Sequence, residues 1–416
     1  MVRHGSIVWH PWLKLFGVAT VILASFVLVG RSRAASPATA PGDPNALLPG
    51  EKEEGFVSIF NGKDLAGWVI DHSDVKSFVA RNGAIECLGT GDYTTILRTD
   101  QMYENFELRL EYMTPSWCEG GVLFHVPSIG RAIRLGTKIQ IYHPVGVKPE
   151  PTVAGSIFGV LAPPKDMAKP ARQWNDLRIL SDWPRLRVEL NAERLHDVNV
   201  DQIEDLKYRE RTGYIALQDI GSRPAFRRIR VRTLPPRDKW ESLFNGRDFT
   251  GWHEADSATW VVKDGVMHAS NGTGYQISDR KFKDFELKAL VRTSPRSNGG
   301  IFFRWRREET KDKDRGYEIQ IRNSPDSSHP TGSIYEIDRA RDDEITQENE
   351  WFLMHIIARG PHVISRLDGK TVSEIRDAKK LEPGSIALQM HSMNSWVEWK
   401  DILIKDLSAG APGGAR

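Results

Sequence analysis

The sequence has little cysteine and no excess of charge of either sign. Cys87 and Cys118 are its two cysteines among 416 residues, which excludes a disulfide-rich scaffold. Their spacing does not match a metal-binding motif, and either one disulfide or two buried thiols fits them. Because 57 Lys and Arg nearly balance 55 Asp and Glu, and no basic cluster is interleaved with aromatic residues, we expect no nucleic-acid partner.

Long hydrophobic runs are also rare, and the one that stands out lies at the N-terminus. Residues 15–30 are apolar, basic residues precede them, and the small residues Ala34 and Ala35 follow. This order is typical of a secretory signal peptide, so we assign residues 1–35 to one. The run is slightly shorter than the roughly 20 residues that span a bilayer, and a retained membrane anchor is the alternative. Both interpretations predict an exported protein that is periplasmic, cell-surface or secreted.

The rest of the chain is a duplication. Residues 36–54 are rich in Pro, Ala and Gly and are predicted to be a flexible linker. The phrase at 56–68, FVSIFNGKDLAGW, returns at 240–252 as WESLFNGRDFTGW, and other echoes follow in the same order. The repeat is domain-sized, so we predict one copy at 55–234 and a second at 239–408. A Pro-rich joint at 235–238 separates them, and residues 409–416 are expected to form a disordered tail.

Each copy reads as a series of short β-strands. Segments of four to eight residues alternate between apolar and polar side chains, and Gly, Pro, Asn and Asp separate them. Long helical periodicity is absent. The pattern predicts an all-β fold with two tandem antiparallel β-sandwich or jelly-roll domains.

Strand alternation places several polar side chains of the second copy on one face. Residues two apart in a strand point the same way, so Glu318 and Gln320 share a side, as do Gln389 and His391. Arg304 is predicted to point outward as well. If the three strands are neighbours, these five residues form one polar patch on the outer surface of a sheet. The alternative is that they are ordinary solvated residues of a half-exposed sheet.

The two copies differ at three of these positions. The first copy has Lys138 for Glu318, Ile220 for His391 and His125 for Arg304. Lysine and isoleucine do not replace a carboxylate and an imidazole in proton transfer at neutral pH. We therefore expect any chemistry in the second copy, whereas the glutamines recur in both, as Gln140 with Gln320 and Gln218 with Gln389.

The phrase LFNGRDFTGW at 243–252 and several later motifs resemble the 3-keto-disaccharide hydrolase domain family. The motifs are NGGIFF at 298–303, GYEIQ at 316–320, TGSIY at 331–335, EW at 350–351 and LQMH at 388–391. The resemblance covers nearly all of 239–407, and the first half is similar to a weaker member. It implies a concanavalin-like (lectin/glucanase) sandwich, export, and cleavage of glycosidic bonds in sugars that carry a ketone at C3.

The resemblance also implies roles for individual residues. Glu318 and His391 are the candidate general base and acid, in either order. Arg304 is expected to bind the carbonyl or enolate oxygen. The remaining candidate substrate-binding residues are Asn298, Gln320, Gln389, Tyr335 and Trp351. No ligand spacing demands a metal or another cofactor, although a divalent metal could serve the same electrophilic role.

Other functions stay open on the sequence alone. A non-catalytic, lectin-like carbohydrate-binding protein would use the same outer face without turnover. A cell-surface interaction protein would use the sandwich as a scaffold. Conventional glycoside hydrolysis needs two carboxylates roughly 5–10 Å apart, and Glu318 has only Glu336 as a poorly placed second.

Overall fold

The computed structural model describes residues 43–71, 76–127, 132–306, 316–324, 327–341 and 346–408. The expected signal peptide or anchor at 1–35, the first part of the expected linker and the tail at 409–416 lie outside these residues. Helix is confined here to the short segments α1 (Ala132–Leu135), α2 (Glu204–Lys207) and the 3-10 turn η1 (Val200–Gln202). In this described part of the chain, no helix has the length and apolar character needed to cross a membrane.

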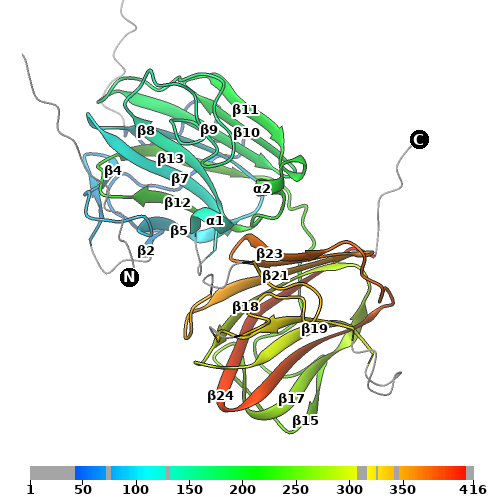
Figure 1. Cartoon of the computed structure of the whole chain (residues 1–416). Helices are drawn as coiled ribbons and strands as arrows, with labels where there is room; N and C mark the ends of the chain where they lie inside the picture. Colours follow the sequence, from blue (N-terminus) through cyan, green and yellow to red (C-terminus); the bar gives the residue numbers. More distant parts are fainter. Residues whose placement is uncertain are drawn as a thin grey trace, which may run out of the picture. The chain divides into compact units, whose positions relative to one another are not determined.

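The first copy folds into two antiparallel sheets, drawn from blue to green in Figure 1. One sheet has the order β11-β10-β9-β6-β13-β4-β3, with β1 beside β13, and the other has the order β2-β5-β12-β7-β8. The strands are β1 (Val57–Ser58), β2 (Trp68–Asp71), β3 (Phe78–Arg81), β4 (Ala84–Cys87), β5 (Ile96–Tyr103), β6 (Phe106–Met113), β7 (Cys118–Val126), β8 (Thr137–His143), β9 (Trp174–Asp182), β10 (Arg185–Leu190), β11 (Glu193–Asn199), β12 (Gly213–Asp219) and β13 (Ala225–Thr233).

Alternation along the strands builds the core between these sheets. In β6 every second residue is buried, so Phe106, Leu108 and Leu110 point inward while the charged residues between them are half-buried. They pack against Val122 and Phe124 of the facing sheet. The first copy is therefore a two-layer sandwich, as the strand pattern predicts.

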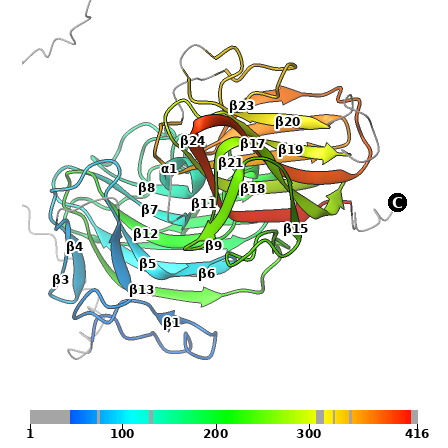
Figure 2. The same ribbon diagram turned by 90° about the horizontal axis from the view of Figure 1, so that it is seen from below.

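The second copy is a sandwich whose two layers share long strands. Its strand order is β15-β17-β24-β18-β21-β22-β23, with β19 beside β24 and β20 beside β19 (Figure 2). One end of β17 and β24 pairs within the layer of β15, β19 and β20, and the other end of β24 pairs with β18. The strands are β14 (Glu241–Ser242), β15 (Trp252–Asp256), β16 (Thr259–Lys263), β17 (Val266–Phe282), β18 (Phe285–Thr293), β19 (Gly299–Trp305), β20 (Tyr317–Ile321), β21 (Phe352–Arg359), β22 (His362–Leu367), β23 (Lys370–Ile375) and β24 (Gly384–Asp406).

The described part of the expected linker, residues 43–54, is not free of the first sandwich. Glu51 is buried and its carboxylate accepts from the Arg230 guanidinium at 2.7 Å. Asn45 is also buried, and its side-chain amide donates to the main-chain oxygen of Gly83 at 2.9 Å. The prediction of a flexible linker is wrong for this segment. Its composition does not reveal that two polar side chains form hydrogen bonds to the first sandwich.

The two cysteines are buried free thiols. Burial raises the pKa of Cys118 to about 12, and burial likewise raises the pKa of Cys87. A thiol with a raised pKa is a poor nucleophile, so neither cysteine is suited to catalysis in this environment.

Candidate active site

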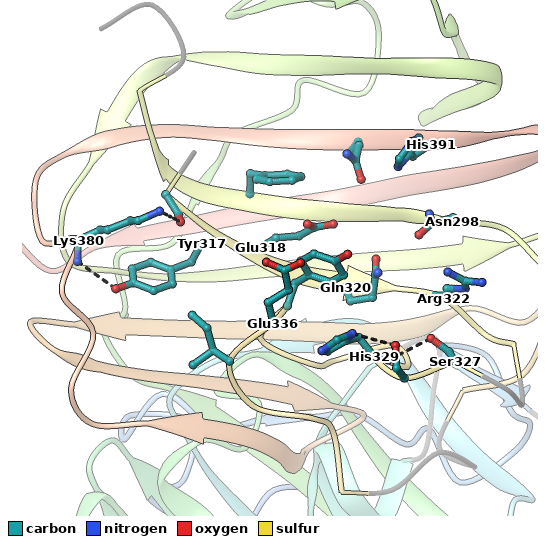
Figure 3. Close-up of a pocket in the computed structure, with 16 residues that line it drawn as sticks. Asn298, Tyr317, Glu318, Gln320, Arg322, Ser327, His329, Glu336, Lys380 and His391 are labelled. Carbon is teal, nitrogen blue, oxygen red and sulfur yellow. Dashed lines mark hydrogen bonds between the residues drawn. The ribbon is translucent and has the colours of Figure 1, made fainter. Parts of the chain in front are cut away.

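The second copy has a pocket of about 770 Å³ on the outer face of the layer formed by β19, β20 and one end of β24 (Figure 3). The outer face is the side of this layer that points away from the sandwich core. Six of the residues singled out in the sequence line the pocket: Asn298, Glu318, Gln320, Tyr335, Gln389 and His391.

The strand register explains how these residues meet. Gly300 in β19 lies opposite Gln320 on one side and opposite Gln389 on the other. The neighbours Ile319 and Leu388 point into the core, which leaves both glutamines on the outer face. Strand alternation therefore places side chains from three strands around a single glycine.

That glycine makes room for the carboxylate. A methyl group added to Gly300 would overlap the Glu318 carboxylate, which lies over the glycine. The adjacent Gly299 approaches the main-chain oxygen of Gln389 closely. The Gly-Gly pair therefore serves close packing around the pocket and is not a phosphate-binding loop.

Some polar atoms of the pocket are held by hydrogen bonds within the protein, and one is not. The Gln389 side-chain amide donates to the Tyr275 hydroxyl at 3.0 Å, which fixes its orientation. The main chain of Asn298 accepts from the His391 N–H at 2.8 Å and so holds β24 against the start of β19. The Asn298 Oδ1 is buried without a hydrogen-bond partner among the described residues. Such an atom is costly to leave unpaired and is suited to a ligand hydroxyl.

A loop segment forms one wall of the pocket. The N–H groups of Gly332 and Tyr335 donate to the main-chain oxygens of Gln320 and Glu318 at 2.8 and 2.9 Å. The segment therefore extends the sheet beside β20 and carries Tyr335, which is 38% exposed, to the rim. Glu336 follows with a φ of 59°, a conformation that non-glycine residues adopt rarely and that often marks a functional site.

Sequence reasoning missed several residues that line the pocket: Arg322, Ser327, Ser328, His329, Glu336 as a pocket residue, and Lys380. Arg322 continues the alternation of Glu318 and Gln320, so strand parity extended by one step would have found it. The other residues lie in loops, where no periodic signal indicates the direction of a side chain.

Arg304 does not lie in this pocket, and its predicted position on the polar patch is wrong. A β-bulge interrupts β19 between Phe302 and Trp305, and Arg304 itself has a φ of 50°. Its side chain is fully buried, with donors pointing away from the outer face. The guanidinium donates to the main-chain oxygens of Lys283, Lys380 and Gly360 at 2.8, 3.1 and 2.9 Å and to the Asp284 carboxylate at 3.1 Å.

Trp351 is also absent from the residues that line the pocket. Its ring packs beneath the Arg292 guanidinium and the Lys400 ammonium group, at 4.7 and 4.4 Å from the ring centroid. These cations come from β18 and from the end of β24 that pairs with it. The expectation that Trp351 contacts substrate came from its position in a motif, and the structure gives it a packing role with these cations.

The corresponding place in the first copy is filled. Lys138 takes the position of Glu318 and lies over Gly121, the counterpart of Gly300. Its ammonium group lies 4.4 Å from the centroid of the Phe158 ring, and burial lowers the pKa of Lys138 to about 8. Gln218 donates to the main-chain oxygen of Tyr93 at 2.8 Å. The place that holds the Glu318 carboxylate in the second copy is thus occupied in the first by a buried lysine side chain.

The described residues contain no group of three or more His, Cys, Asp or Glu side chains that could hold a metal ion. The pocket instead combines two carboxylates, two imidazoles and three amides: Glu318, Glu336, His329, His391, Asn298, Gln320 and Gln389. Such a set can move protons and bind hydroxyl groups.

Several known proteins are similar to parts of this chain. A curated relative from Bacteroides thetaiotaomicron, named a 3-keto-disaccharide hydrolase, is 29% identical over 90 residues, which cover 18% of this chain and 31% of that protein. The match thus spans about a third of the length of this relative. A crystal structure from Parabacteroides distasonis, provisionally described as a glycosyl hydrolase, is 24% identical over 46% of this chain and 99% of that chain, with a TM-score of 0.42. A β-1,3-1,4-glucanase (lichenase) from a mouse hindgut metagenome is 12% identical over 40% of this chain and 98% of that chain, with a TM-score of 0.30.

The family comparison covers most of the chain. The model of the 3-keto-α-glucoside-1,2-lyase-like domain matches residues 55–232 and again residues 239–405. These two matches coincide with the two sandwiches, and the second includes every residue of the pocket. The chain therefore belongs to the family of 3-keto-α-glucoside-1,2-lyase-like domains, and it contains two copies of that domain.

Proposed function

We propose that the second copy cleaves glycosides whose sugar ring carries a ketone at C3, by removing the C2 proton and eliminating the group at C1. Family membership indicates a carbohydrate-active domain of the glycosyl-hydrolase type. The observation that supports the finer proposal is the presence of Glu318 and His391 in one pocket, among amide side chains that suit hydroxyl groups.

The chemistry requires two proton-transfer groups. The ketone at C3 acidifies the C2–H bond, and a base takes this proton while the bonding electrons form an enolate. The enolate then re-forms the C3 carbonyl, a double bond forms between C1 and C2, and the bond between C1 and the glycosidic oxygen breaks. An acid protonates the departing oxygen, and water later adds across the new double bond. No oxidant or reductant is consumed.

Glu318 and His391 supply the base and the acid between them. The carboxylate and the imidazole reach the pocket from different strands, so one sugar ring bound there could contact both groups. The enolate oxygen needs a cationic or hydrogen-bonding donor, and Arg304 is held elsewhere. Arg322 and Lys380 line the pocket and are the candidates for this donor.

The test is release of 4-nitrophenol from 4-nitrophenyl 3-keto-glucosides of both anomeric configurations. We expect release by the full chain and its loss in Glu318→Gln and in His391→Ala. Removing a positioned acid or base typically lowers the rate by about 10²–10⁴-fold. Adding EDTA in a parallel assay tests whether a divalent metal takes part.

Matched variants outside the pocket control for folding. Glu241→Gln changes an exposed carboxylate that pairs with Arg280, and His362→Ala changes a histidine of β22 that pairs with Glu374. Both should retain activity. Saturable binding of the keto-glucoside without release of nitrophenol would reject the lyase proposal and favour the lectin-like alternative.

A further inference from the structure

A second hollow of about 530 Å³ lies on the same layer of the second copy. Its lining comes from β15, β17, β19 and β24, and includes His253, Asp279, Lys281, Trp305 and Ser385. It shares none of its lining residues with the pocket that holds Glu318, and the proposed function does not use it.

The two hollows lie on the same face of this layer. In β24, Gln389 lines the pocket and Ser385 lines the second hollow, and residues an even number of positions apart share a side of a strand. Four residues of extended strand cover roughly 13 Å. That length exceeds a single sugar ring. A sugar ring bound in the pocket would therefore leave the second hollow free for another part of the same ligand.

Three aromatic rings form the boundary between the hollows. We call Tyr275, Phe302 and Trp305 the aromatic ridge; their ring centroids lie 4.7–5.8 Å apart. Phe302 lines the pocket and Trp305 lines the second hollow. The ridge therefore borders both spaces, and its three rings, which are 3–5% exposed, pack against one another between two sets of polar groups.

The first copy shows that the fold does not require this ridge. Its counterparts are aliphatic: the ladder positions of Tyr275, Phe302 and Trp305 hold Ile96, Leu123 and Val126. The apolar side chains of Ala132 and Ile133, in α1, pack against this aliphatic cluster. The copy without the carboxylate and the imidazole thus covers this part of its outer face with its own chain.

The polar groups of the second hollow suit hydroxyl recognition. The Nδ1 atom of His253 lies 2.9 Å from the Asp279 carboxylate, and both side chains are at least half exposed. An imidazole, a carboxylate and the Trp305 ring in one hollow match the usual composition of a small-molecule site, in which a few polar groups orient a ligand against apolar surface.

We propose that the second hollow is a subsite for further sugar rings of an oligosaccharide whose reacting ring occupies the pocket. The chain would run along β24, across the aromatic ridge, from Gln389 to Ser385. This inference rests on the proposed function for the identity of the reacting ring, but not for the presence of a carbohydrate site. It makes the preferred substrate an oligosaccharide with several rings on the leaving-group side.

The first test compares substrates of different length. The value of kcat/KM is measured for 4-nitrophenyl 3-keto-glucosides and for the 3-keto derivatives of maltotetraose and cellotetraose oxidised on the non-reducing ring. In His253→Ala and Asp279→Ala we expect the ratio of the tetrasaccharide value to the short-substrate value to fall about five- to tenfold, as for one lost hydrogen bond to a ligand. His362→Ala, outside both hollows, should keep the wild-type ratio.

A second measurement does not depend on turnover. Unoxidised glucose, maltotetraose and cellotetraose are titrated calorimetrically into wild-type protein and into His253→Ala. Tighter binding of a tetrasaccharide than of glucose, reduced in the variant, supports the subsite even if no keto-glucoside is cleaved. Equal affinity for short and long sugars, or a His253→Ala variant that loses nothing on the long ones, overturns it. His253→Ala and Asp279→Ala each change a side chain that is at least half exposed, so both variants should fold.

Discussion

Replacing Arg304 tests whether its guanidinium holds the second sandwich together or faces the substrate. The side chain is fully buried and donates to three main-chain oxygens and to the Asp284 carboxylate. In Arg304→Ala all four acceptors lose the guanidinium, although Asp284 Oδ1 keeps a bond from the Gly360 N–H at 2.9 Å. Breaking a fully buried charge pair costs about 3–5 kcal/mol, and because the Asp284 side chain is 26% exposed we expect a loss near the lower end, about 3 kcal/mol, in the unfolding free energy.

The first copy supplies an intermediate variant. His125 occupies the same bulge with a φ of 54°, and its Nε2 lies 2.6 Å from the main-chain oxygen of Glu104, which corresponds to Lys283 in the second copy. Arg304→His should therefore keep one of the four hydrogen bonds. We expect it to be less destabilised than Arg304→Ala, with the difference on the order of 1 kcal/mol for the retained bond.

Urea unfolding followed by tryptophan fluorescence measures both variants. The two sandwiches can unfold in separate transitions, so His125→Ala is measured in parallel to identify the transition of the first copy. The interpretation predicts that Arg304→Ala shifts the other transition. If Arg304→Ala unfolds at the wild-type urea concentration and instead loses affinity for keto-glucosides, the guanidinium faces substrate and the buried network is wrong.

Two further predictions concern a glycine and a histidine. Gly300→Ala should displace the Glu318 carboxylate and lower kcat with little change in stability. The matched variant Gly121→Ala in the first copy should leave kcat unchanged. Full activity of Gly300→Ala would contradict the assigned place of the carboxylate. Burial lowers the pKa of His125 to about 4, so between pH 6.5 and 4 the unfolded chain takes up a proton that the folded chain does not. Acidification through this range should therefore lower the unfolding free energy of the first sandwich by about 3 kcal/mol at most. The loss should appear as a lower urea midpoint and should be smaller in His125→Asn. Equal losses in the wild-type protein and in His125→Asn would refute this prediction.

Strand parity succeeded where the strands are regular. Glu318 and Gln320 belong to β20, which pairs with β19 without a break, and Gln389 and His391 belong to the regular start of β24. Alternation between core and outer face then follows from the pleat alone. The duplicated phrases likewise made the two-sandwich organisation readable, because each copy repeats the same order of strand segments.

The prediction failed where one residue is inserted. A bulge at Arg304 reverses the alternation, so Trp305 joins Phe302 on the outer face and Arg304 turns inward. Nothing in the residue types of this strand distinguishes a bulge from a regular pleat. The wall residues His329 and Glu336 lie in a loop without periodic sequence, so the pattern did not predict that their side chains line the pocket.

The two copies differ by more than the Glu318 carboxylate and the His391 imidazole that the first copy lacks. Replacing Lys138 with glutamate and Ile220 with histidine would give the first copy the same pair of titratable residue types. However, Lys138 is stacked on Phe158 over Gly121, and α1 packs on the aliphatic counterpart of the aromatic ridge. A ligand needs an outer face that the chain itself leaves uncovered. The proposed proton-transfer pair therefore lies in the copy that keeps an open pocket, whereas Lys138 fills the corresponding place in the first copy.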